Sequence, residues 1–186
     1  MAIAWSLIAI GIILFIWAAA VFNSFIGKRN RVKNAWSDID VQLKRRYDLI
    51  PNLVETVKGY KEYEASVLEN VTKARAGAMN VQGGDAANRA QAENMLSGAL
   101  KSFFAITENY PQLKASENFK KLQEELSSIE NDIQSARKYY NASVRELSNA
   151  IQVFPANIVA GIFGFRQAKF FGADENEKNA VKISLK

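Results

Sequence analysis

Apolar residues form one uninterrupted segment at the start of the chain. Residues 2–26 carry no charge, and their polar members are Ser6, Asn23 and Ser24. As a helix this segment would extend about 37 Å, which exceeds the roughly 30 Å hydrocarbon core of a bilayer. A core helix of a small soluble domain does not fit, because the segment is apolar on every face. We predict a transmembrane signal anchor over residues 1–27.

A cleaved signal peptide is the alternative interpretation of this segment. Signal peptides begin with a basic region and carry an apolar run of roughly 7–15 residues. This segment has no basic residue and a longer run, so the anchor is favoured. The run of alanines at residues 18–20 keeps a cleavage site open as an alternative.

From Val32 onward, apolar residues recur at alternating steps of four and three, which predicts amphipathic helices. Pro51 lies within this stripe. Because the residue before a proline disfavours helical angles, we expect a tight turn between two helices there. The stripe keeps its phase across Pro51, so one long helix kinked at this residue is the alternative. The stripe positions are Val32, Trp36, Ile39, Leu43, Arg46, Ile50, Leu53, Val57, Tyr60, Glu64, Val67, Val71, Ala74 and Ala78.

Two further helices follow a loop at residues 81–85, which contains two glycines. Asp85 is the expected N-cap of the third helix, and Pro111 its expected end. Ser116 should cap the fourth helix, which Pro155 should close. The third helix carries Ala92, Leu96, Ala99, Phe103, Ile106 and Tyr110 on one face. The fourth carries Phe119, Leu122, Leu126, Ile129, Ile133, Ala136, Tyr140, Ser143, Leu147, Ile151 and Phe154.

These elements predict an all-α protein: an N-terminal transmembrane helix followed by an antiparallel four-helix up-and-down bundle over residues 28–154. Each apolar stripe is too narrow to be stable alone and must face the others. A dimeric coiled coil made from one long helix is the alternative, but the short glycine loop favours pairing within the chain. Residues 155–172 form an apolar segment, and residues 173–186 a polar tail.

The net charge of +5 is concentrated just after the apolar segment, between residues 28 and 46. Basic residues flank the cytoplasmic side of membrane helices, so we expect a single-pass protein of the cell (inner) membrane with its N-terminus outside and its bundle in the cytoplasm. The run from Lys44 to Arg46 beside Tyr47 could suggest nucleic-acid binding. Its juxtamembrane position favours topology and anionic-lipid attraction instead. We therefore expect no nucleic-acid partner.

The composition removes most catalytic chemistry. The chain has no His and no Cys, which excludes histidine-based acid–base catalysis, thiol chemistry and disulfides. Carboxylates remain, but Asp38 and Asp40 do not share a helix face, and neither do Glu124 and Glu125. We predict that the chain is not an enzyme and has no cofactor, catalytic residue or metal site. A carboxylate- or metal-dependent enzyme stays as an alternative function.

Short segments along nearly the whole chain resemble the LemA family in the same order. They are RNRVKNAW (29–36), IDVQLKRR (39–46), DLIPNLV (48–54), VKGY (57–60), YPQLKA (110–115), ARKYYN (136–141), FP (154–155) and FGF (163–165). The resemblance implies an N-terminal signal anchor with a short outside N-terminus and a helical-bundle domain. Many relatives have a His where this chain has Tyr63. The molecular function of the family is not established, so the resemblance implies no site residues.

Two residues in the stripe are charged, Arg46 and Glu64. We expect both at the bundle edge, with their stems packed and their charged ends in water. The alternative is that they form buried ion pairs with other helices and so fix the register of the bundle.

The apolar segment after the bundle should return to the membrane, because an even number of helices brings the chain back to its starting end. Aromatic and basic residues are favoured together at a bilayer surface. The alternative, which we favour, is that these Phe side chains close the open end of the bundle. Candidate membrane-surface residues are Lys28, Arg29, Arg31, Lys33, Phe163, Phe165, Arg166, Lys169, Phe170 and Phe171.

We expect a membrane-anchored scaffold or adaptor that binds another protein. Its expected partners are the lipid bilayer and other membrane-associated proteins, and the sequence leaves a homo-oligomer open. An anionic-lipid-binding module is a further alternative, carried by the basic segment after the anchor.

Overall fold

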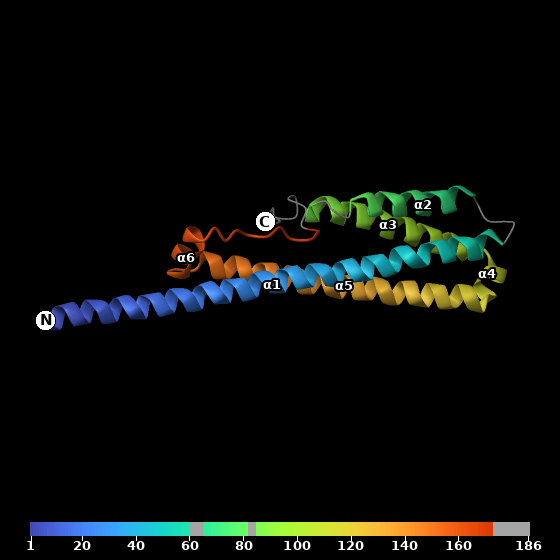
Figure 1. Ribbon diagram of the computed structural model, residues 1–186. Helices are drawn as coiled ribbons and strands as arrows, with labels where there is room; N and C mark the ends of the chain where they lie inside the picture. Colours follow the sequence, from blue (N-terminus) through green and yellow to red (C-terminus); the bar gives the residue numbers. More distant parts are fainter. Residues whose placement is uncertain (60–64, 82–84, 173–186) are drawn as a thin grey trace, which may run out of the picture. The chain divides into compact units, whose positions relative to one another are not determined.

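The computed structural model describes residues 1–59, 65–81 and 85–172, and this part of the chain contains six α-helices and no strand (Figure 1). The predicted all-α class with a long apolar N-terminal helix is confirmed. The helices are α1 (Ala2–Lys58), α2 (Ala65–Asn80), α3 (Ala86–Thr107), α4 (Pro111–Ala115), α5 (Glu117–Gln152) and α6 (Ala156–Ile162).

The chain forms two compact units, and the two longest helices, α1 and α5, contribute residues to both. The first unit contains residues 1–37 and 138–168, and so includes the apolar start of α1, the end of α5 and α6. The second contains residues 38–137 and the described residues 169–172. In the second unit, α2 runs beside α3 (Figure 1).

Pro51 lies inside α1, which continues to Lys58. The expected turn at Pro51 is therefore wrong, and one long helix is the correct alternative. A proline has no N–H, so the carbonyl of Tyr47, four residues earlier, loses its helical donor. Arg75 of α2 supplies another donor, with its Nε 2.7 Å from the Tyr47 carbonyl oxygen. Contact with α2 thus satisfies the backbone where the local sequence favours a break.

The apolar stripe predicted from Val32 to Ala78 is the buried face of α1 and α2. Trp36 and Ala74 are partly buried, and Tyr60 and Glu64 lie outside the described residues. The spacing thus identified this face correctly, although it crosses from one helix to the next. The buried positions are Val32, Ile39, Leu43, Arg46, Ile50, Leu53, Val57, Val67, Val71 and Ala78.

The ends of the third and fourth predicted helices follow from their capping residues. Asp85 caps α3 as predicted, since its Oδ1 accepts a hydrogen bond from the Asn88 N–H at 3.0 Å. That bond, with the ion pair to Lys169, lowers the pKa of Asp85. Pro111 does not end α3, which stops at Thr107; it begins α4, where its missing N–H is tolerated. Ser116 caps α5 as predicted, through the Phe119 N–H.

The stripe of α5 is buried at most of its predicted positions, but it ends earlier than expected. Phe154 lies beyond the last residue of α5, Gln152, and is 76% exposed. The buried positions are Phe119, Leu126, Ile129, Ile133, Tyr140, Ser143, Leu147 and Ile151. Leu122 and Ala136 are partly buried.

Ile133 tests the packing of α5, because its side chain is 0% exposed. Ile133→Ala should lower the free energy of unfolding by about 2–5 kcal/mol, since it leaves a cavity among helices that cannot collapse fully. Urea unfolding of the full chain in detergent micelles, followed by circular dichroism, measures this loss. The neighbouring exposed residue gives the control: Gln134→Ala should change stability by less than about 0.5 kcal/mol. An equally small loss for Ile133→Ala would show that this face does not pack.

Candidate functional site

Arg46 is the centre of a buried ionic network in the second unit. Its side chain is 0% exposed, so the expectation of a bundle-edge position with the charge in water is wrong. The guanidinium reaches two other helices: Nη2 pairs with Glu93 of α3, and Nη1 pairs with Glu130 of α5 at 2.9 Å. Arg46 therefore forms the inter-helix ion pairs that were the alternative interpretation. Glu64, the other charged stripe residue, lies outside the described part of the chain.

Glu93 is fully buried, and both of its oxygens have partners. Oε2 binds Arg46, and Oε1 accepts a hydrogen bond from the hydroxyl of Tyr47. Burial and this bond to a carboxylate raise the pKa of Tyr47 well above its ordinary value. The phenol therefore stays protonated and donates its hydrogen bond to the carboxylate, which helps to satisfy a charge held away from water.

Glu130 connects the network to the surface. Its side chain is 32% exposed, and its Oε1 accepts a hydrogen bond from Ser97 at 3.0 Å. Ser97 is itself 2.9 Å from Nη1 of Arg46. Beside these two residues, α3 and α5 border a groove of about 410 Å³ whose apolar lining includes Leu100, Phe104 and Leu126.

A second set of arginines surrounds this centre. Arg89 is 2% exposed and pairs with Asp40 of α1. Arg137 of α5 donates to Asn94 of α3 at 3.4 Å, and its guanidinium lies 4.7 Å from the centroid of the Phe171 ring. Burial and the nearby positive charge of Arg46 lower the pKa of Arg137. The network thus combines three arginines with three carboxylates, so its formal charges balance.

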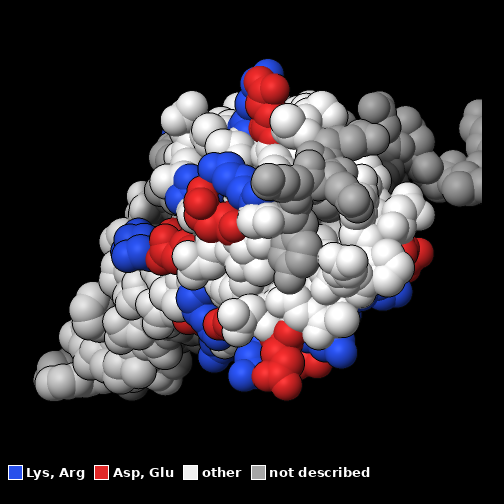
Figure 2. Space-filling model, turned by 90° about the vertical axis from the view of Figure 1, so that its right-hand side faces the viewer, with Lys and Arg blue, Asp and Glu red and all other residues white. Residues whose placement is uncertain are grey.

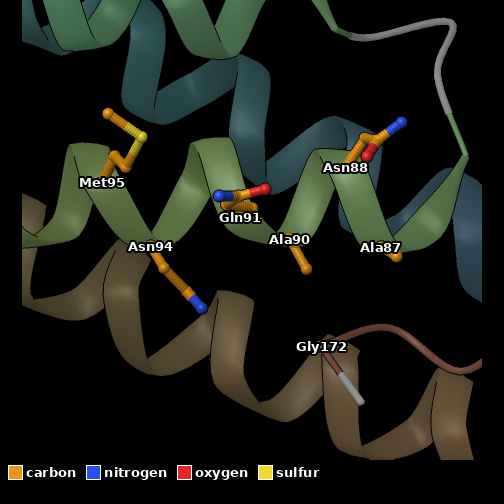
Figure 3. Close-up of a pocket in the computed structure, with 7 residues that line it drawn as sticks. All are labelled: Ala87, Asn88, Ala90, Gln91, Asn94, Met95 and Gly172. Carbon is orange, nitrogen blue, oxygen red and sulfur yellow. The ribbon is translucent and has the colours of Figure 1, made fainter. Parts of the chain in front are cut away.

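A hollow of about 580 Å³ lies along the start of α3 (Figure 3). Its polar lining consists of amide side chains, and Figure 3 shows Asn94 pointing from α3 toward the neighbouring helix ribbon. Amides can hydrogen-bond a ligand but neither transfer protons at neutral pH nor act as nucleophiles. The lining residues are Ala87, Asn88, Ala90, Gln91, Asn94, Met95 and Gly172.

The arrangement of charges favours a structural role for the network. The oxygens of Glu93 are occupied by Arg46 and Tyr47, which leaves no free carboxylate oxygen there to act as a base. Across residues 1–59, 65–81 and 85–172, no group of three or more His, Cys, Asp or Glu is placed to hold a metal ion. The geometry of the network supports the joining of helices.

The candidate membrane-surface residues fall into two groups. In the first unit, Phe163 contacts Phe22, and Arg29 lies over the Phe165 ring at 5.6 Å. Lys28, Arg31, Lys33 and Arg166 also belong to the first unit, as does α6. The other three candidates belong to the second unit: Lys169 pairs with Asp85, Phe170 is partly buried, and Phe171 is 3% exposed.

Figure 2 shows basic and acidic side chains interspersed on one face of the molecule. Surface ion pairs also join opposite charges in the first unit, where Lys28 and Arg31 lie 3.9 and 2.8 Å from Glu146. On the visible face, the described Lys and Arg side chains form no continuous basic area of the kind that binds a nucleic-acid backbone.

Residues 35–185 match the LemA family. The match begins within α1 and includes helices α2 to α6. The chain belongs to the LemA family. Protein LemA of Metamycoplasma hominis is 28% identical over 181 residues, which cover 96% of this chain and 80% of that protein. The resemblance seen in the short sequence segments is thus confirmed.

Two magnetosome proteins are also similar to this LemA-family chain. Magnetosome protein MamQ of Magnetospirillum gryphiswaldense is 24% identical, and Magnetosome protein MamQ 2 of Paramagnetospirillum magneticum is 23% identical. Each match covers 81% of this chain and 64% of the relative, so the chain spans just under two thirds of their length.

Membership of this family and the exposed apolar start of α1 identify a membrane-associated protein. An 18-residue window of α1 has a mean hydropathy of 2.5, and none of its residues is buried. A helix of this length and composition can cross a bilayer, where its apolar side chains need no protein partner.

Sequence reasoning missed Arg89 and Glu93, which lie on the buried face of α3. On the predicted face, Leu96 and Phe103 are buried and the other members are partly buried. The fully buried face of α3 is therefore the one that also carries Arg89 and Glu93. The spacing along α3 could have indicated this face, because its buried residues follow steps of three and four: Arg89, Glu93, Leu96, Leu100 and Phe103. The first two were passed over because charged residues are rarely fully buried unless they are paired.

Arg46→Met should lower the free energy of unfolding by about 3–5 kcal/mol, because it leaves Glu93 as an uncompensated buried charge. Adding Glu93→Gln removes that charge, so the double variant should recover at least about 1 kcal/mol of the loss. Denaturant unfolding of the single and double variants in detergent gives this coupling energy.

The adjacent arginine is the matched control for this cycle. Arg45 is half-exposed and pairs with Asp132 at 3.6 Å, so Arg45→Met should cost less than about 1 kcal/mol. Equal losses for Arg45→Met and Arg46→Met, or strictly additive effects at Arg46 and Glu93, would contradict the network as the link between these helices.

Proposed function

We propose that this LemA-family protein is a membrane-tethered scaffold or adaptor whose helical bundle binds another protein. The observation that carries the proposal is a groove of about 550 Å³ between α2 and α3. Its lining contains Ala74, Gly77 and Ala78 from α2, and Ala92 and Ala99 from α3. Such small side chains leave room for a partner helix to approach closely and place its apolar face in the groove.

The two helices that form the groove also carry exposed methionines. Met95 of α3 lines the groove and is 66% exposed, while Met79 of α2 is 39% exposed. Methionine is unbranched and polarisable, and it adapts to partners of different shape. Asn70 and Lys73 add polar contacts at the groove. These features support an amphipathic helix of another membrane-associated protein as the partner.

We also propose that the chain acts by binding and not by catalysis. The sequence supplies neither His nor Cys. The buried Glu93 is engaged by Arg46 and Tyr47, as described above. The carboxylate- or metal-dependent enzyme, kept as an alternative from the sequence, therefore has less support than the scaffold.

For the membrane, we propose a single-pass orientation in the cell (inner) membrane, with the N-terminus outside and the bundle in the cytoplasm. The support is the charge asymmetry: no charged side chain precedes Lys28, and basic residues follow it closely. Ion pairs to Glu146 neutralise part of this flank, but Arg29 and Lys33 remain exposed.

The natural chain has no Cys, so single introduced cysteines report this orientation directly. A cysteine at Ala2 should react with a membrane-impermeant maleimide in intact spheroplasts. A cysteine at the exposed Lys121 of α5 should react only after the membrane is permeabilised. The opposite pattern of labelling would reverse the proposed orientation.

A photo-cross-linking amino acid at Met95 should capture a discrete protein partner in intact cells. Gly77→Leu places a larger side chain in the groove, and its Cβ has room because a Cβ at Gly77 meets nothing within 4 Å. This variant should reduce the adduct by about tenfold, which corresponds to roughly 1.4 kcal/mol of lost binding energy.

The control for this experiment is Lys121→Leu, which adds the same side chain to an exposed position of α5 outside the groove. It should leave the adduct unchanged. If no adduct forms at Met95, or if Gly77→Leu and Lys121→Leu give equal yields, the groove is not the partner site.

A further inference from the structure

The segment from the end of α5 through α6 exposes an unusual number of large apolar side chains. Phe154 is 76% exposed, Ile158 54% and Ile162 73%, and they follow one another at steps of four. Phe163 is 58% exposed beside them. The opposite side of α6 packs inward, with Val159 4% and Ala160 3% exposed. A grouped apolar face of this kind marks an interaction surface rather than an ordinary water-exposed one.

The contacts of Phe163 place this face at a defined level along α1. The ring centroids of Phe163 and Phe22 are 4.7 Å apart. The stretch from Ala2 to Phe22 measures about 31 Å as a helix, close to the roughly 30 Å hydrocarbon core. The polar, exposed Asn23 and Ser24 follow it. Phe22 therefore marks the edge of the hydrocarbon region, and Phe163 lies at the same edge.

A second aromatic residue fixes the segment against α1. Phe165 contacts Phe22 and Phe25, with ring centroids 5.7 and 5.1 Å apart. Phe25 is 2% exposed, so this part of the cluster is packed within the protein. The aromatic residues thus divide into a packed member, Phe165, and an exposed member, Phe163. The expected closure of the bundle end by these Phe side chains explains the packing of Phe165, but it does not explain why Phe163 is exposed.

Two basic residues accompany this cluster, one on α1 after its apolar start and one directly after Phe165 in the sequence. Arg29 lies over the Phe165 ring at 5.6 Å, and Arg166 follows Phe165 and is exposed. Aromatic residues at the headgroup level with basic residues beside them are typical of a membrane-interface contact.

We propose that α6 and its flanking residues form a second membrane contact, with Phe154, Ile158, Ile162 and Phe163 inserted into the bilayer interface beside α1. The occupant of this face is the lipid itself, because the face is continuous with the apolar surface of the span through Phe22 and Phe163. The first unit is thereby attached to the membrane at two points, which restricts how it can rotate about α1. The proposal rests on α1 crossing the bilayer and is independent of the partner groove.

The test uses the full chain in vesicles of phosphatidylcholine with a minority of phosphatidylglycerol. Single cysteines at Ile158 and Ile162 carry a nitroxide, and collisions with oxygen and with a water-soluble nickel chelate report its surroundings. Oxygen concentrates in lipid and the chelate in water. Both sites should favour oxygen over the chelate. A nitroxide at the adjacent exposed Asn157 is the aqueous control, and one at Ile10 in the span is the lipid control.

Each other outcome overturns the proposal in a recognisable way. Chelate accessibility at Ile158 and Ile162 equal to that at Asn157 would place the face in water. Shielding from both reagents would indicate a protein surface, such as a second copy of the chain. A water-exposed nitroxide at Ile10 would reject the span itself and the contact with it, whereas the partner groove would still be tested by its own cross-link.

Discussion

The burial of Arg46 is the constraint on which the packing of the second unit depends. A guanidinium with no exposed surface is stable only when carboxylates and hydrogen bonds replace its water. Here the carboxylates come from two different helices, Glu93 of α3 and Glu130 of α5. A shift of any of these helices along its axis would separate the charges and leave at least one uncompensated. Apolar side chains alone tolerate such a shift better, so we infer that the ion pairs select one register of the bundle.

The same turn of α1 also holds α2. The carbonyl of Tyr47 lacks its helical donor because residue 51 is a proline, and Arg75 of α2 donates to it instead. The hydroxyl of Tyr47 meanwhile binds Glu93 of α3. Two adjacent residues of α1 therefore contact all three of the other long helices. Pro51, which weakens α1 locally, creates the acceptor that attaches α2.

Much of this fold could be predicted from the sequence, because apolar spacing and capping are local signals. The stripe from Val32 to Ala78 and the cap at Asp85 are found where the pattern placed them. The continuity of α1 through Pro51 could not be predicted, since its compensation comes from Arg75, 28 residues away in the sequence.

The ionic network was only partly predictable for the same reason. The charged residue at position 46 of an apolar stripe was a clear signal of something unusual. Its partners lie 47 and 84 residues further along the chain, and charged side chains on a helix usually mark its solvated face. Only the packed structure shows that Glu93 belongs to the core. The aromatic segment was a similar case, because spacing could not show that Phe165 packs while Phe163 is exposed.

In this LemA-family protein, charged side chains are buried around Arg46, whereas large apolar side chains are exposed on and beside α6. This distribution indicates which parts of the molecule can bind others. The ionisable side chains of the bundle interior neutralise one another, and they are placed to hold helices together. Beyond the apolar start of α1, the exposed large apolar side chains include a group on and beside α6, and Met79 and Met95 on α2 and α3. Exposed apolar surface of this extent is unfavourable in water and is retained where another phase or another protein covers it. The proposed lipid contact fits the first surface, because Phe163 contacts Phe22 in the apolar start of α1. The proposed partner helix fits the second surface, because small side chains line the α2–α3 groove. The exposed apolar surfaces, and not the buried ionic groups, are therefore the parts of this protein that we propose to bind other molecules.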